Sequence, residues 1–181
     1  MLAMKHAGLT LIELLIMLVI ASVLLGAAAP SFHQSLQRLR LQAAVNDLLA
    51  AIDLTRTQAL ARGSKVLMAP LQQEWQSGWV VFLDQNGNRR PDAEEKILYR
   101  HDPLRTDIVI TSKFTSGNSP AYLAYNGTGR TCAAGNSIAA RWGTLSLTQG
   151  DQARHIKINM LGRVRVCDPA TASANCTGAD D

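Results

Sequence analysis

Hydrophobic and polar positions divide the chain into two unequal parts that meet near Gly63. Residues 9–29 read LTLIELLIMLVIASVLLGAAA and are apolar on every side, apart from the carboxylate of Glu13. A run of about 20 apolar residues has the length that an α-helix needs to cross the hydrocarbon core of a bilayer. The pattern predicts a helix that begins at Leu9 and whose first half is hydrophobic all round.

Beyond Pro30 the apolar positions recur at spacings of three, four and seven, which is typical of an amphipathic helix. This stripe consists of Leu41, Val45, Leu48, Ile52 and Ala59. Because Gly63 is a favourable stop signal, we expect one helix from Leu9 to Arg62. Pro30 lacks a backbone N–H and clashes with the preceding turn, so the helix should bend there.

After the helix the chain changes to short runs typical of β-strands, separated by turn sequences such as DQNGN, SGNSP, NGTG and TQGD. The runs are KVLMAP, GWVVFL, KILYR, DIVIT, AYLAYN, GTLSLT, HIKINM and RVRVC. Trp79 and Val81 share one face by the period of two. We therefore expect Trp75, Trp79 and Phe82 to pack in the sheet and core rather than to stack on a ligand. The sequence predicts an α+β fold, with the amphipathic half of the helix packed on an antiparallel β-sheet head.

About 120 residues follow the helix, enough for one globular domain with its own core.

The distribution of charged residues along the chain is more informative about binding partners than the net charge, which is +4 over 181 residues. Residues 108–167 contain one acid, Asp151, against seven bases. The bases are Lys113, Arg130, Arg141, Arg154, Lys157, Arg163 and Arg165.

Motifs for catalysis are absent from the sequence: there is no G-x-S-x-G, P-loop, GxGxxG or HExxH. His33, His101 and His155 have no companion at a useful spacing. We therefore expect no enzyme, no cofactor and no small-molecule substrate. The stretch from Asp84 to Glu95 alternates like a calcium loop, but Arg89 stands where such a loop requires glycine. We expect a hairpin loop there and no metal site.

Three cysteines are present, Cys132, Cys167 and Cys176. In an extracytoplasmic domain cysteines form disulfides, and a bond between Cys167 and Cys176 would close a short loop. We favour this pair, and a bond from Cys132 to either of the others is the alternative, because spacing does not settle connectivity. Without a CxxC or a histidine at ligand spacing, zinc is disfavoured.

Three interpretations compete for the N-terminal segment: a plain membrane anchor, a cleaved secretory signal and a prepilin. The stretch AGLTLIEL, residues 7–14, resembles the type III leader of type IV pilins and pseudopilins. The resemblance implies that a prepilin peptidase cleaves after Gly8 and that Leu9 becomes N-methylated. It also places Glu13 at the fifth mature position. Leu9 departs from the phenylalanine that is usual in that family.

Glu13 raises a physical question, because a carboxylate within a membrane-spanning segment is costly. In an assembled filament Glu13 can pair with the positive α-amino group of a neighbouring subunit. Such a charge-assisted contact is much stronger at low dielectric than in water. We therefore interpret Glu13 as an assembly residue.

The β-rich part carries a second resemblance. The stretches WQSGWVVFLDQNGNRRPDAEEKILYR, AYNGTGR and ARHIKINMLGRVRVC are similar to the GspH/FimT-type minor pilin domain. The resemblance implies a type IV pilin fold and a minor subunit near a filament tip, with other pilin subunits as partners. It also implies one span of the inner membrane, a periplasmic head, and later a place in a pilus or pseudopilus. The predicted segments are a leader (1–8), a transmembrane and filament-core helix (9–29), its amphipathic continuation (30–63), a β-rich head (64–167) and a polar tail (168–181).

The end of the head suggests a ligand. Arg163 and Arg165 are two apart, so on an extended strand both guanidinium groups face one way, and such groups bind phosphate oxygens bidentately. The motif Gly162-Arg163-Val164-Arg165 matches the GRxR of FimT-type pilins that bind DNA during natural transformation. The resemblance implies an edge that binds double-stranded DNA. Its residues are Arg154, Lys157, Arg163 and Arg165. A solvated strand face, or a structural pseudopilin of type II secretion, is the alternative.

Overall fold

The computed structural model of the protein describes residues 10–105, 107–115, 117, 119, 121–171 and 176. The chain divides into two compact units, residues 1–39 and 40–181. The predicted cleavage pair, Gly8 and Leu9, lies outside the described residues.

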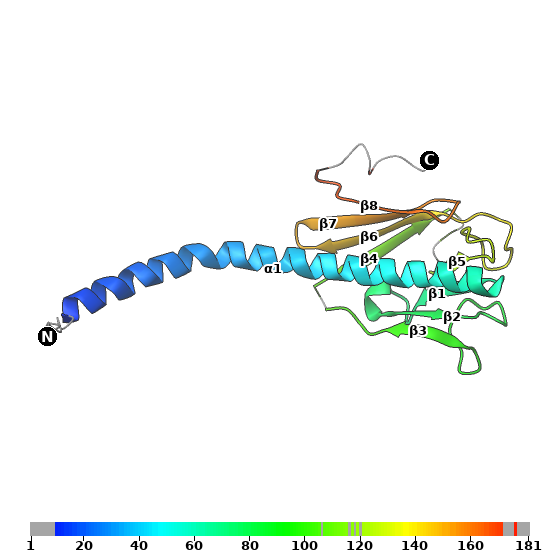
Figure 1. Ribbon diagram of the computed structural model, residues 1–181, viewed down its shortest axis with the longest axis horizontal. Coiled ribbons are helices and arrows are strands. Elements are labelled where there is room, and N and C mark those ends of the chain that lie inside the picture. Colours follow the sequence, from blue (N-terminus) through cyan, green and yellow to red (C-terminus); the bar gives the residue numbers. More distant parts are fainter. Residues whose placement is uncertain are drawn as a thin grey trace, which may run out of the picture. The chain divides into compact units, whose positions relative to one another are not determined.

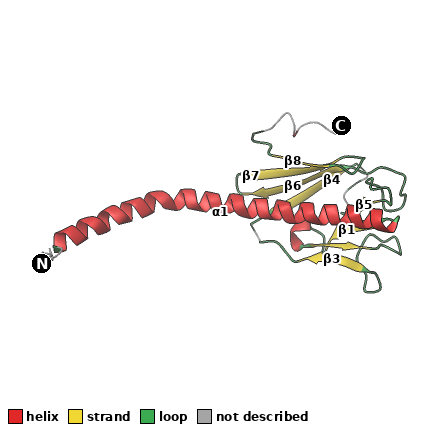
Figure 2. Ribbon diagram, in the orientation of Figure 1, coloured by secondary structure: helices red, strands yellow, loops and turns green. Residues whose placement is uncertain are grey.

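In the N-terminal unit the chain is helical from Leu11, where helix α1 (Leu11–Arg62) begins (Figures 1 and 2). The large apolar side chains from Leu11 to Leu25 are each more than half exposed in the isolated chain. The helix is long and apolar enough to cross a membrane. It continues through residue 30, and the bend expected at Pro30 stays a prediction.

The part of α1 that belongs to the second unit is amphipathic, as predicted. Leu41, Val45, Leu48, Ile52 and Ala59 are all buried, and they share one core cluster with residues from the strands. The exposed positions between them carry polar and charged side chains such as Asp53. This segment therefore forms one layer of the head, because its apolar stripe needs a sheet to cover it.

The strands of the head form two antiparallel sheets. The first sheet has the order β3 (Ile97–His101), β2 (Trp79–Phe82), β1 (Val66–Pro70) and β5 (Leu123–Tyr125). The second sheet has the order β4 (Val109–Phe114), β6 (Gly143–Gln149), β7 (Gln152–Ile158) and β8 (Val164–Cys167). A short 3₁₀ helix, η1 (Trp75–Ser77), lies between β1 and β2 in the chain. Each of the predicted runs overlaps one of these strands.

The division into two sheets differs from the expectation of one. After β3 the chain enters the second sheet, where β4 pairs with β6. It then goes back to the first sheet, where β5 pairs with β1, before β6, β7 and β8 complete the second sheet. Both sheets contribute to the cluster that covers the buried stripe of α1, for example Met68 from β1 and Ile156 from β7. The two sheets thus share one core, which is what the α+β prediction requires.

Strand β2 is buried on both faces, which explains why its sequence WVVF shows no polar alternation. Trp79 and Val81 point into the main core, as predicted. Val80 and Phe82 belong to a second cluster, which also contains Cys132. Trp75 is also buried in the main core. The expected packing role of the aromatic residues is therefore confirmed.

Candidate functional site

The first candidate residue, Glu13, lies in the first turn of α1. The Glu13 carboxylate accepts hydrogen bonds from the backbone N–H and the hydroxyl of Thr10, at 3.2 Å and 3.3 Å. In return the Thr10 hydroxyl accepts from the Glu13 N–H at 3.3 Å. This reciprocal arrangement is a capping box, which satisfies the free donors at a helix start. The carboxylate therefore already has local partners before any contact with a second subunit.

The second candidate site begins at a tight turn, residues 159–163, which joins β7 to β8. The Gly162 N–H donates to the Asn159 carbonyl at 3.0 Å, and the Asn159 side chain accepts from the Arg163 N–H at 2.9 Å. Gly162 has a φ of 78°. A Cβ at that position would lie 2.4 Å from the carbonyl oxygen of Gly129. Both its backbone angle and its surroundings therefore require glycine at this position.

Two side chains hold this turn from the core side. The Gly162 carbonyl accepts from Arg56 Nη1 at 3.1 Å and from the Tyr125 hydroxyl at 3.3 Å. Tyr125 is fully buried, and this burial raises the pKa of its hydroxyl well above the ordinary value. Tyr125 therefore remains a neutral donor. Sequence reasoning missed both residues, because Arg56 is far from the turn in the chain and Tyr125 reads as an ordinary strand residue.

Arg163 is the last residue of this turn, and Arg165 lies on β8, the edge strand of the second sheet. Both residues are exposed. Among the described residues neither forms an ion pair with a carboxylate. Their guanidinium groups therefore lie where an external anion can reach them.

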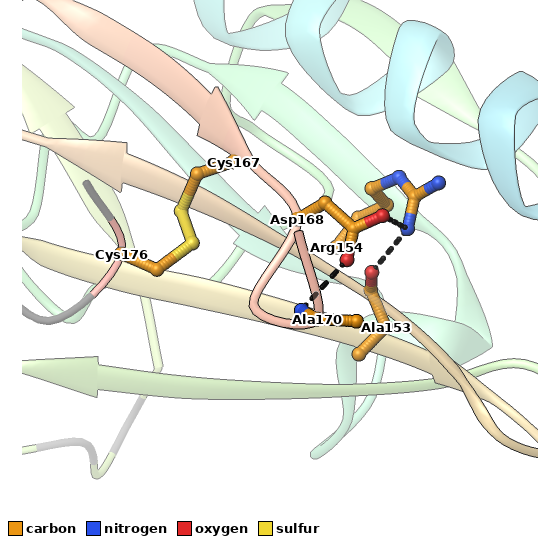
Figure 3. A network of polar contacts seen from close by, with 6 residues as sticks. All are labelled: Ala153, Arg154, Cys167, Asp168, Ala170 and Cys176. Atoms are coloured by element: carbon orange, nitrogen blue, oxygen red, sulfur yellow. Dashed lines mark hydrogen bonds and ion pairs between the residues drawn. A yellow bond between two sulfur atoms is a disulfide. The ribbon is translucent and has the colours of Figure 1, made fainter. Parts of the chain in front are cut away.

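The other two residues of the predicted basic edge are placed differently. Lys157 lies opposite Arg165 in the strand register, but it is only 8% exposed. Arg154 is engaged through Nη1, which contacts the Asp168 carboxylate at 2.8 Å and donates to the Ala153 carbonyl (Figure 3). Sequence spacing does not distinguish Arg154 and Lys157 from the two exposed arginines, because it reveals neither the burial of Lys157 nor the contact of Arg154 with Asp168. The structure narrows the accessible edge to Arg163 and Arg165.

A disulfide joins Cys167 to Cys176, the pair that the short loop favoured, with a Cα–Cα distance of 5.8 Å (Figure 3). His155 lies beside this bond, so that its ring nitrogen and the two sulfurs are within 4.8 Å of one another. Metal binding by cysteine requires thiolates, and both sulfurs are consumed in the disulfide. This trio is therefore not a zinc site in the oxidised protein.

Comparison with known proteins places these features in a family. A family model described as the type II transport protein GspH matches residues 44–162. The pilin-like protein PilA1 of Thermus thermophilus is 34% identical over 169 residues, which cover 90% of this chain and 99% of that protein. The chain belongs to the GspH family of pilin-like proteins. The pilin family implies that the subunit associates with other pilin subunits.

Solved structures agree with this assignment at the level of the fold. The type IV minor pilin FimU of Pseudomonas aeruginosa superimposes with a TM-score of 0.58 at 19% identity, covering 74% of this chain and 92% of FimU. The minor pseudopilin EpsH from the type 2 secretion system of Vibrio cholerae gives 0.50 at 11% identity, with 72% and 98% covered. The long N-terminal helix with an antiparallel β-rich head is thus the fold of minor pilins.

The calcium-like loop of this GspH-family pilin is the connection of the β2–β3 hairpin, as expected. Its carboxylates bind the loop's own backbone: Asp84 accepts from the Gly87 N–H at 2.9 Å, and Glu95 accepts from the Gln85 N–H at 2.9 Å. Arg89, at the position that a calcium loop reserves for glycine, has a φ of 66°. These groups therefore shape the hairpin.

Arg141 shows why a count of basic residues overstates the surface charge of the pilin. It is only 1% exposed, and its guanidinium group lies 3.9 Å from the ring centre of Tyr122 and 4.3 Å from that of Phe114. Nη2 donates to the Gly117 carbonyl at 2.8 Å. Burial lowers the pKa of Arg141. This residue is part of the packing, in cation–π contacts.

Proposed function

We propose that this GspH-family pilin is a minor subunit of a type IV pilus whose head binds DNA for uptake in natural transformation. The observation that carries the proposal is the exposed pair formed by Arg163, the last residue of the turn, and Arg165 on the edge strand β8, without a carboxylate partner among the described residues. Arginine forks match the geometry of phosphate oxygens. The turn that precedes the pair is held by Arg56 and Tyr125, so the first arginine leaves a fixed backbone.

The contact that we propose is made to the phosphate backbone and is independent of sequence. Binding by one head should be weak, on the order of 10⁻⁴–10⁻⁶ M at physiological salt. Weak binding suffices when several subunits engage one long polymer, because linked sites raise the effective concentration.

The route to the filament is also part of the proposal. Prepilin peptidase would cleave after Gly8 and Leu9 would be N-methylated, while helix α1 holds the subunit in the inner membrane with its head in the periplasm. The apolar surface of α1 and the pilin family support this route. A mass spectrum of the membrane-extracted protein should show a chain that begins with methylated Leu9. An intact leader, or a cut after Ala29, would refute it.

The test of DNA binding is a titration of the full chain in a nonionic detergent with duplexes of unrelated sequence at two salt concentrations. Arg163→Ala and Arg165→Ala should each weaken binding and lower the log–log salt slope by about 0.9. Arg100→Ala is the matched control, because Arg100 is an exposed strand arginine of the other sheet. Equal binding by wild type, Arg163→Ala and Arg165→Ala would overturn the proposal.

A second candidate function is that of a minor pseudopilin in type II secretion, with a structural or protein-contacting role. The description of the matching family model and the likeness to EpsH favour it. Under this alternative the wild-type chain would not bind DNA even at low salt.

A further inference from the structure

Two turns of the head are built to the same plan. Residues 126–130 read NGTGR and residues 159–163 read NMLGR, so each begins with asparagine and ends with glycine followed by arginine. In both turns the glycine N–H donates to the carbonyl of the asparagine, at 2.9 Å and 3.0 Å. The asparagine N–H donates to the arginine carbonyl, again at 2.9 Å and 3.0 Å. The two turns therefore share their main-chain hydrogen bonds.

The side chains of these turns repeat as well. The asparagine Oδ1 accepts from the N–H of the arginine at 3.1 Å in the first turn and at 2.9 Å in the second. The two glycines have φ values of 74° and 78°. Because the two turns share these hydrogen bonds and glycine φ values, the backbone of each arginine has the same position relative to its own turn. Arg130 and Arg163 are thus presented by equivalent local structures, although only Arg163 belongs to a GRxR motif.

The two turns also touch each other. A Cβ on Gly162 would lie 2.4 Å from the carbonyl oxygen of Gly129, so the backbones are in contact immediately before both arginines. The Thr131 hydroxyl donates to the Asn159 carbonyl at 2.9 Å and joins the turns a second time. Arg56 lies against both turns, because it donates to the Gly162 carbonyl and its Nε is 3.3 Å from the position that a Cβ on Gly129 would take.

The surroundings of the paired turns favour an anion. Arg130 and Arg163 are both exposed, and among the described residues neither is ion-paired with a carboxylate. Arg130 also lines a surface hollow of about 820 Å³, whose lining includes Lys65 and the hydroxyl residues Ser64 and Thr128. No acidic residue is among the described residues that line this hollow.

We propose that Arg130 and Arg163 together form a phosphate-contacting pair for the backbone of a nucleic acid, which makes Arg130 a DNA-binding residue outside the GRxR motif. This inference rests on the proposed function, and it extends the site from the edge strand to the neighbouring turn. Because both arginines stand on rigid, abutting turns, binding has to order their side chains but not their backbone, so both can contribute to the contact.

The experiment uses the full chain in a nonionic detergent and measures the affinity for a DNA duplex over a series of salt concentrations. Arg130→Ala should weaken binding about fivefold at physiological salt and lower the salt slope by about 0.9, as expected for one lost phosphate contact. Arg163→Ala should have the same effect. Arg130→Lys should keep most of the slope because the charge remains, and Arg100→Ala should change neither quantity.

The outcomes separate this inference from the proposed function. If Arg163→Ala weakens binding while Arg130→Ala and Arg130→Lys bind as wild type, the pair is refuted and the proposed function stands. If wild type does not bind, the proposed function itself fails. Thermal unfolding of each variant shows whether the turn has been damaged. Should Arg130→Ala unfold early, Arg130→Gln decides the question, and a wild-type slope in that variant refutes the pair.

Discussion

Gly162 shows how one residue without a side chain can position another. Its left-handed backbone and the nearby Gly129 carbonyl leave no room for a Cβ, and its own carbonyl is held by Arg56 and Tyr125. Arg163 follows directly, so its direction depends on this contact. The GRxR pattern thus contains a structural glycine as well as two candidate ligands.

Gly162→Ala should lower the free energy of unfolding by more than the roughly 1–2 kcal/mol that a left-handed backbone alone costs, because the new Cβ meets the Gly129 carbonyl. Gly150→Ala is the matched control, since Gly150 also has a positive φ of 54° but nothing lies within 4 Å of its Cβ position. Chemical denaturation of both variants measures the difference. Equal losses would contradict the close contact.

Glu13 closes the capping box of α1, and substitution can separate this contact from the assembly role that we propose for it. Glu13→Ala removes both the cap and the charge, so the membrane-held subunit should still accumulate while its incorporation into sheared filaments drops. Thr10→Val removes the capping hydroxyl, at a cost of about 1 kcal/mol to the helix start, and keeps the carboxylate. Quantitative blots of the filament fraction should show normal incorporation for Thr10→Val. Normal incorporation of Glu13→Ala would contradict the assembly role.

At the scale of elements, periodicity predicted the helix and each strand found among the described residues, because both signals are local. The division into two sheets was missed, since the pairing of β5 with β1 depends on contacts between residues far apart in the chain. The surroundings of the proposed basic edge were predictable only in part. Arg163 and Arg165, chosen from a short motif, are exposed, whereas the burial of Lys157 and the ion pair of Arg154 follow from neighbours that spacing does not reveal.

Cys132 offers a test of the packing between elements. It is buried in the second cluster, beside residues of β2, and this burial raises the pKa of its thiol to about 11. The thiolate is the reactive form, so in the folded protein Cys132 should resist alkylation until the pH approaches that value. Mass spectrometry after iodoacetamide treatment at mildly alkaline pH should find it unmodified. Rapid labelling in the native protein, at the rate seen after unfolding, would contradict this burial.

At the scale of the whole molecule, burial separates a head from an anchor. The buried stripe of α1 begins at Leu41, and the large apolar side chains before residue 26 are exposed in the isolated chain. Among the described residues, the core of the head therefore contains none from the anchor. A fragment of residues 36–181 keeps the whole buried stripe and Arg40, whose Nη1 lies 3.9 Å from the Asp107 carboxylate.

We expect this fragment to be soluble without detergent and to unfold cooperatively. Its free energy of unfolding should lie within about 0.5 kcal/mol of that of the head in the full chain, because the removed residues whose burial the structure describes, 10–26 and 31–35, are all exposed. Circular dichroism during thermal and chemical denaturation measures this. Its salt slope for DNA should equal that of the full chain, since all the proposed phosphate contacts lie in the head. A fragment that aggregates, or that binds with a smaller slope, would show that the anchor contributes to the fold or to the site. Agreement of both quantities would mean that the anchor part of helix α1 is dispensable both for the fold of the head and for the proposed DNA binding.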